Sequence, residues 1–214
     1  MYDTTAQQRL TDKLDYEIWV LDFLSTMMDL FHGGTDISTI QLMNRGEVKR
    51  FLSIHDHLGT KYAQQVIDTM APLTFTASYK VLDMIYEWIL EENLSVGVIT
   101  EVPWKFSKKV NLIKLTDLIY PSLFTSNPHL KDYSFAFFTN LLPYRNDIVH
   151  NHNFSVLADR ITLVDSKAGT NLTLDRTHIG YLVRFVVAVA QCLVGKVVFD
   201  IFIDRLINTT ANVF

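Results

Sequence analysis

The segment of residues 144–152, Tyr-Arg-Asn-Asp-Ile-Val-His-Asn-His, carries the side chains that could do chemistry in this chain. Arginine is a permanent, planar cation that matches phosphate oxygens in bidentate fashion, and Arg145 supplies it here. Histidine titrates near neutral pH and can act as a general acid or base, and His150 supplies it. Together they suit transesterification at an RNA phosphate, with the guanidinium stabilising the charge that develops on the phosphate. That mechanism needs no metal ion.

Helical geometry decides which of these side chains can meet. At about 100° per residue, Asn146 and His150 are neighbours on one face of a helix, whereas His150 lies about 140° from Arg145. His152 would fall almost over Arg145 if the helix continued that far. A single helix therefore does not aim the guanidinium and the imidazole at one point, but a bend or a second copy of the helix would bring them together.

The sequence Arg-Asn-Asp-Ile-Val-His, residues 145–150, resembles the signature of the HEPN superfamily. That signature is an arginine and a histidine with four to six residues between them, and a polar residue often follows the arginine. The resemblance implies a bundle of four or five helices that dimerises, with the motifs of both subunits meeting at the interface. Many HEPN proteins are metal-independent endoribonucleases of toxin–antitoxin, abortive-infection and CRISPR-linked defence systems.

By this resemblance, Arg145 and His150 are the catalytic pair and Asn146 is a supporting polar residue. The implied partners are a second copy of the chain, RNA as the substrate, and an antitoxin or another protein of a defence system; no cofactor and no metal are implied. One branch of HEPN toxins has a tyrosine two residues after the histidine, where this chain has His152. We place His152 among the residues that contact the substrate.

A second candidate set is basic. Lys105, Lys108 and Lys109 occur at i, i+3 and i+4, so a helix would place them on one side. Such a strip could follow an RNA backbone, because lysine side chains neutralise phosphates. A solvated helix face is the plainer interpretation of the same spacing.

Other interpretations of the motif stay open. Arg145 could pair with a carboxylate such as Asp83 or Glu87 and stabilise the bundle, with His150 favoured by the dipole at a helix C-terminus. The chain could also be a catalytically inactive HEPN-type module that serves in dimerisation or docking.

A metal site is a further alternative for the same segment. His150 and His152 could bind a metal ion together with Asp147. No cysteine, glutamate or further histidine follows closely in the sequence to complete a tetrahedral site, so we expect no metal.

The bulk properties suit one globular domain in a reducing compartment. The chain has 214 residues, of which 49% are hydrophobic and 20% charged, with a net charge of -4, so no global basicity indicates nucleic acid. The single cysteine, Cys192, cannot form an intramolecular disulfide, which favours the cytoplasm. We expect neither a signal peptide nor a membrane span, because charges interrupt the most apolar stretch, 183–203.

Apolar periodicity predicts a mainly α chain. Apolar residues at three- and four-residue steps predict helices over 10–31, 47–70, 74–92, 105–119 and 131–150, with breaks at Gly33-Gly34 and at Pro72. Alternation then predicts one β-hairpin at about 154–175, which turns at 166–170. Asp175 or Thr177 would cap a last helix, roughly 176–207.

We therefore expect a HEPN-like helical bundle with extra N-terminal helices and one β-hairpin after the motif helix. Residues 71–214 would form the bundle with its hairpin. Residues 1–70 would form an N-terminal helical layer, either within the same domain or apart from it.

Overall fold

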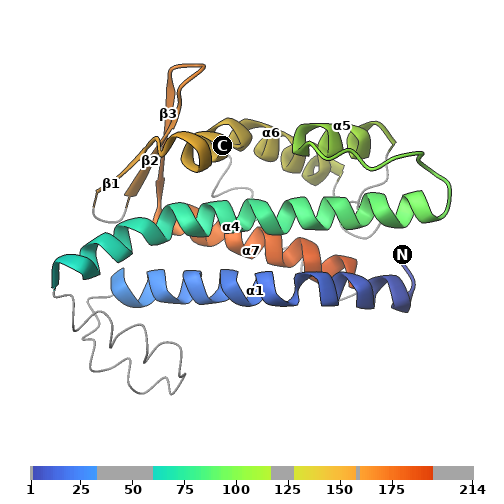
Figure 1. Cartoon of the computed structure of the whole chain (residues 1–214), viewed down its shortest axis with the longest axis horizontal. Coiled ribbons are helices and arrows are strands. Elements are labelled where there is room, and N and C mark those ends of the chain that lie inside the picture. Colours follow the sequence, from blue (N-terminus) through green and yellow to red (C-terminus); the bar gives the residue numbers. More distant parts are fainter. Residues whose placement is uncertain (1, 33–59, 117–127, 158–159, 195–214) are drawn as a thin grey trace.

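The computed structural model describes residues 2–32, 60–116, 128–157 and 160–194. Five helices and three strands make up these parts of the chain (Figure 1). In chain order they are α1 (Thr4–His32), α4 (Thr60–Ser95), α5 (Phe106–Thr116), α6 (Pro128–Asn151), β1 (Phe154–Leu157), β2 (Arg160–Asp165), β3 (Thr170–Asp175) and α7 (Arg176–Leu193). The mainly α class is confirmed, whereas the helices predicted over 47–59, 117–119 and 195–207 lie outside the described residues.

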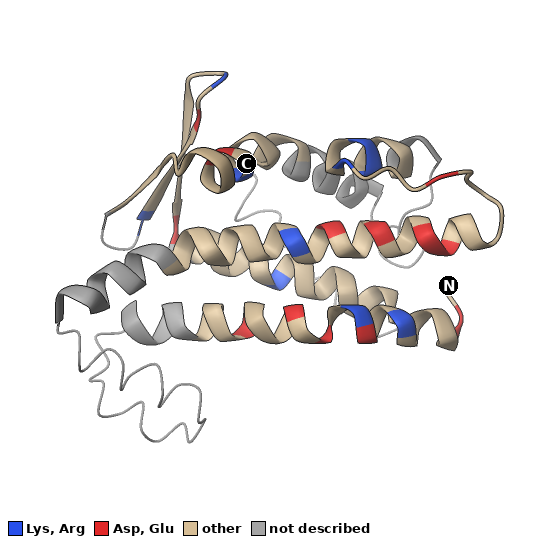
Figure 2. Cartoon of the chain, in the orientation of Figure 1, with Lys and Arg blue, Asp and Glu red and all other residues tan. Residues whose placement is uncertain are grey.

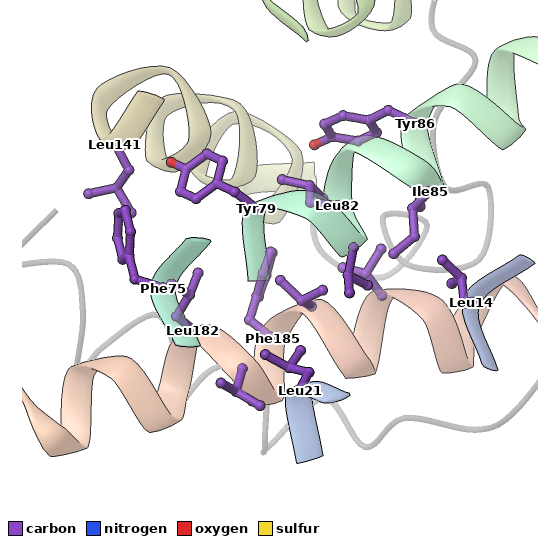
Figure 3. Packing of buried hydrophobic residues seen from close by; sticks show 14 of the residues in the cluster. Leu14, Leu21, Phe75, Tyr79, Leu82, Ile85, Tyr86, Leu141, Leu182 and Phe185 are labelled. Atoms are coloured by element: carbon purple, nitrogen blue, oxygen red, sulfur yellow. The ribbon is translucent and has the colours of Figure 1, made fainter. Parts of the chain in front are cut away.

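Helix α4 is the centre of the fold. It packs against α1 and α7 on one side and against α5 and α6 on the other (Figure 1). Its buried side chains recur at helical steps over both sides, and Figure 3 shows them between α6 and α7. The labelled members from α4 are Phe75, Tyr79, Leu82, Ile85 and Tyr86. A long helix that is apolar over most of its circumference can serve two layers at once.

Helix α1 shares this core. Leu10, Leu14 and Leu21 are buried in the same cluster as the α4 and α7 side chains. Ion pairs that each include one exposed side chain join α1 to α4 along their length: Arg9 with Glu92, Lys13 with Glu87 and Glu91, and Glu17 with Lys80. Exposed pairs contribute little stability, but their order shows that the two helices run antiparallel. The suggested boundary at residue 70 lies inside α4, and the division into two units there stays a prediction.

The predicted break at Pro72 is wrong, because α4 runs through this residue without interruption. Proline removes one helix hydrogen bond and costs about 3 kcal/mol in a helix interior. Here the flanking residues Met70, Ala71 and Phe75 are buried, so packing on both sides of the proline favours a continuous helix. The hydroxyl of Thr76 also donates to the Pro72 carbonyl at 2.7 Å.

The segment predicted as one hairpin is a three-stranded antiparallel sheet in the order β1-β2-β3. The β2–β3 hairpin is as expected, and its turn ends at Gly169, whose φ of +67° suits glycine. The run predicted as the first strand is divided, with Leu157 paired to Arg160. This division keeps one apolar face, because Val156 opposes Ile161. Ile161, Leu163 and Leu174 are buried on it.

Of the two caps considered for the last described helix, Asp175 and Thr177, the structure uses Asp175. The Asp175 carboxylate accepts a hydrogen bond from the His178 backbone N–H at 2.9 Å, and the Asp175 N–H donates to His178 Nδ1 at 3.2 Å. This reciprocal arrangement is a capping box. No helix in the described ranges combines the length and apolar character needed to cross a bilayer.

Candidate functional site

The motif lies on the last two turns of α6, as the sequence predicts. The helix continues through Pro143 and ends at Asn151. His152 then adopts a left-handed backbone with φ of +52°, which is uncommon for a non-glycine residue and turns the chain out of the helix. The Asn153 N–H donates back to the Asp147 carbonyl at 3.3 Å. The Asp147 carbonyl thus takes part in the hydrogen bonding that ends the helix.

Arg145 and Asn146 line an open pocket of about 440 Å³ between α4, α6 and the start of α5. Arg145 is half-buried, and its Nη1 donates to Asn146 Oδ1 at 3.0 Å. That volume lies within the range of about 300–1,000 Å³ typical of small-ligand sites. The pocket is lined by Tyr79, Lys80, Asp83, Trp104, Lys105, Phe106, Ser107, Leu142, Arg145 and Asn146.

The carboxylates that Arg145 was considered to pair with are bound by another cation. Lys109 Nζ donates to Asp83 Oδ1 at 2.9 Å and to Glu87 Oε2 at 2.6 Å. Burial acts to lower the pKa of Lys109, but its hydrogen bonds to Glu87 and Asp83 outweigh burial, and the pKa is raised. The hydrogen bond from Lys109 is the main cause that lowers the pKa of Glu87.

Lys109 is therefore not part of a solvated basic strip. Its side chain is only 3% exposed, whereas Lys105 and Lys108 are exposed. The expectation of one exposed basic side is wrong for Lys109, because α5 packs against the acidic stretch of α4 and buries this lysine between the helices. Figure 2 shows the basic residues of α5 beside the acidic residues of α4. Of the three, Lys105 also lines the pocket.

The two histidines of the motif lie outside the pocket. His150 and His152 are both exposed, and neither belongs to the pocket wall. Arg145 and Asn146 are thus brought together in one chain, and His150 is kept apart from Arg145, as their angular separation on a helix predicts. Because the His150 side chain is exposed, a second molecule can reach it.

Asp147 holds the motif helix to the sheet. Its Oδ2 accepts hydrogen bonds from the Ser166 backbone N–H at 2.5 Å and from the Ser166 hydroxyl at 2.8 Å, and its Oδ1 accepts one from Asn151 Nδ2. The backbone hydrogen bond from Ser166, followed by the hydroxyl and Asn151 bonds, lowers the pKa of Asp147. Asp147 therefore anchors the β2–β3 turn. In the described part of the chain, no three His, Cys, Asp or Glu side chains are grouped closely enough to bind a metal ion.

Sequence reasoning missed the aromatic wall of the pocket. Trp104 is 80% exposed, and Lys105 Nζ lies 5.1 Å from the centre of its ring. Tyr79 is a buried residue that lines the pocket, and burial raises its pKa well above the usual value. The available signal was the Pro103-Trp104-Lys105 sequence, which places a tryptophan in a polar connection where no core pattern calls for one.

We compared the chain with models of known protein families, with curated proteins and with solved structures, and none of them matched. The functional argument therefore depends on the residues and geometry of this chain.

Proposed function

We propose that this protein is a metal-independent endoribonuclease of the HEPN type, which acts as a homodimer. Its biological role would be that of a toxin or abortive-infection effector in prokaryotic defence, in the cytoplasm. The observation that carries the proposal is the division of the motif on α6. Arg145 and Asn146 line an open pocket with further cations, while His150 is exposed on the same helix and outside that pocket.

A second subunit would complete the site. Within one chain the helix separates Arg145 from His150, so one scissile phosphate bound by Arg145 requires an imidazole from elsewhere. A two-fold axis close to the end of α6 would bring His150 of each subunit towards Arg145 of the other, because an isologous interface places the same surface on both sides.

The reaction would use only groups of the protein and the RNA. The imidazole takes the proton of a ribose 2'-hydroxyl, whose oxygen then forms a bond to the adjacent phosphorus. The bond from phosphorus to the 5'-oxygen breaks, and that oxygen leaves as a hydroxyl after it takes up the proton from the imidazolium, which restores the neutral imidazole. The products are a 2',3'-cyclic phosphate and a 5'-hydroxyl end. The Arg145 guanidinium stabilises the negative charge on the phosphate oxygens in the transition state.

Incubation of total RNA with purified protein in EDTA tests this function. Wild type should cleave, and Arg145→Ala and His150→Ala should each lose at least about 100-fold in rate, because each removes a group used in the transition state. Arg184→Ala is the matched control, since Arg184 is an exposed arginine on α7 that lies over Tyr181. Its rate should equal that of wild type.

The chemical groups at the ends of the RNA products provide a second measurement of the same function. Polynucleotide kinase lacking phosphatase activity should label the new 5'-hydroxyl ends directly. A wild-type protein that leaves RNA intact, with all variants folded, would instead favour the non-catalytic dimerisation or docking module.

A further inference from the structure

The pocket beside the motif has an aromatic edge that the proposed chemistry does not use. Trp104 is the most exposed large hydrophobic side chain in the described part of the chain, at 80%. It lies on the connection before α5, and its neighbour Lys105 lies over its ring. Tryptophan offers a large flat surface, and its exposure leaves that surface in contact with water unless a ligand covers it.

The rest of the pocket wall is suited to an anion. Arg145, Lys105 and Lys80 contribute three cations, and Asn146 adds an amide. Asp83 is the carboxylate in the wall, and its charge is compensated by the ion pair with Lys109 at 2.9 Å. Lys80 forms an ion pair with Glu17 at 2.6 Å, so Arg145 and Lys105 are the lining cations that we expect to bind a phosphate.

The start of α5 adds to this preference. Phe106 and Ser107 are the first two residues of the helix, and both line the pocket. The N-terminus of a helix carries a partial positive charge, which favours anions. The pocket thus combines an exposed indole, cations and an amide within about 440 Å³.

We propose that this pocket is the subsite for one unpaired nucleotide of single-stranded RNA, with its base stacked on Trp104 and its phosphate held by Arg145. Sequence-tolerant recognition of single strands commonly combines aromatic stacking with a cationic track, and a base inside a duplex cannot stack in this way. The inference rests on the proposed ribonuclease function only in naming the polymer as RNA. It identifies the substrate class as unpaired RNA.

Binding of a non-cleavable strand tests the subsite without the chemistry. The probe is a fluorescein-labelled 2'-O-methyl RNA of ten nucleotides, which lacks the attacking hydroxyl, and binding is followed by fluorescence anisotropy in EDTA. Trp104→Ala should weaken binding about 5- to 100-fold, in line with the loss of one base–aromatic stack. Trp104→Phe should restore most of the affinity, because it restores an aromatic face.

A matched control separates this site from other exposed aromatics. Trp19, on α1, is 46% exposed and stacks on Phe23, away from the pocket wall. Trp19→Ala should bind the probe like wild type. Affinity of Trp104→Ala within twofold of wild type, or equal affinity of wild type for the same sequence as a duplex, would overturn the proposal.

Two further experiments, competition by free nucleotides and a comparison of binding with cleavage, identify the ligand. Free nucleoside monophosphates should compete with the probe only at far higher concentration than the unlabelled strand, because one nucleotide lacks the adjoining phosphates. Equal competition would identify a free nucleotide as the ligand and would overturn the assignment to RNA. Strand binding that depends on Trp104 without RNA cleavage would reject the nuclease and keep the subsite, whereas cleavage that depends on His150 but not on Trp104 would reject the subsite alone.

Discussion

The two faces of the α6 segment from Tyr144 to Asn151 have different roles. On the closed face, Ile148 is 6% exposed in the hydrophobic core and Asp147 is 7% exposed in its hydrogen bonds to the β2–β3 turn. On the open face, Asn146 and His150 are exposed, and Arg145 reaches the pocket. The residues of the motif are contiguous in the sequence, but the helix divides them between two faces. One face stabilises the fold, and the other is available for chemistry.

Helix α5 repeats this contrast with two adjacent lysines. Lys109 is buried between two carboxylates, and Lys108 is exposed. Residue type therefore does not separate a structural lysine from an exposed one here, whereas the contacts of each side chain do. Substitutions at neighbouring residues can test this division directly.

The largest difference in stability is expected between Ile148 and its neighbour Val149. Ile148→Ala should lower the free energy of unfolding by about 2–4 kcal/mol, because it leaves a cavity in the core. Val149 is 41% exposed, so Val149→Ala should change it by no more than about 0.5 kcal/mol. Urea unfolding followed by circular dichroism measures both, and equal losses would contradict the division into two faces.

The lysine pair should show a smaller difference. Lys109→Met should cost about 1–3 kcal/mol, because it leaves Asp83 and Glu87 without their shared partner. We place the cost below that of a fully buried pair, since the side chains of Asp83 and Glu87 are 36% and 38% exposed. Lys108→Met is the control and should remain within about 0.5 kcal/mol of wild type in the same urea experiment. If Lys109→Met left the free energy of unfolding unchanged, this buried ion pair would contribute no stability.

Asp147 should make stability depend on pH. Its pKa is lowered in the folded protein, chiefly by the Ser166 backbone hydrogen bond, so its ionised form stabilises the fold above the unfolded-state pKa of about 3.9. That stabilisation is lost as the pH falls through the lower, folded-state pKa. Asp147→Asn should therefore lower the urea midpoint at pH 7, and the difference from wild type should shrink as the pH falls below about 4.

Ser166→Ala provides the comparison for Asp147. It removes the hydroxyl donor but keeps the backbone N–H donor, so its loss of stability at pH 7 should be smaller than that of Asp147→Asn. An Asp147→Asn effect that is the same at pH 7 and pH 3 would show that the carboxylate charge is not what stabilises the turn.

The smallest effect on stability is expected at His150. This side chain is exposed at the end of α6, so His150→Ala should change the free energy of unfolding by about 0.5 kcal/mol or less. The same variant is expected to lose RNA cleavage, which separates a functional role from a structural one. A loss of stability as large as that of Ile148→Ala would place His150 among the residues that hold the fold.

The helices could be predicted because their signal is local. Leu10, Leu14 and Leu21 recur at helical steps, and the structure buries them on one side of α1. Asp175 was one of two candidate caps, with Thr177, from its type and its position before an apolar run, and it caps α7. The continuity of α4 through Pro72 could not be predicted, because it depends on packing by other helices rather than on propensity.

The remaining parts of the site depend on contacts between distant residues. Nothing near Asp147 in the sequence indicates Ser166, which lies on a turn two strands further along. Lys108 and Lys109 are adjacent residues of the same type, and only the approach of α5 to α4 decides which of them is buried. Arg145 and His150 were proposed as site residues from their types and spacing, whereas Trp104 enters the pocket only when α4, α5 and α6 are assembled.

Two heterodimers, each carrying one Arg145 and one His150, test the central claim most directly. Co-expressed chains with different affinity tags allow purification of the Arg145→Ala chain with the His150→Ala chain, and of wild type with the Arg145→Ala/His150→Ala double variant. If each site combines Arg145 of one subunit with His150 of the other, the first heterodimer keeps one intact site and should cleave RNA in EDTA at up to half the wild-type rate. The second has none and should be inactive. An inactive first heterodimer beside an active second would contradict the shared site.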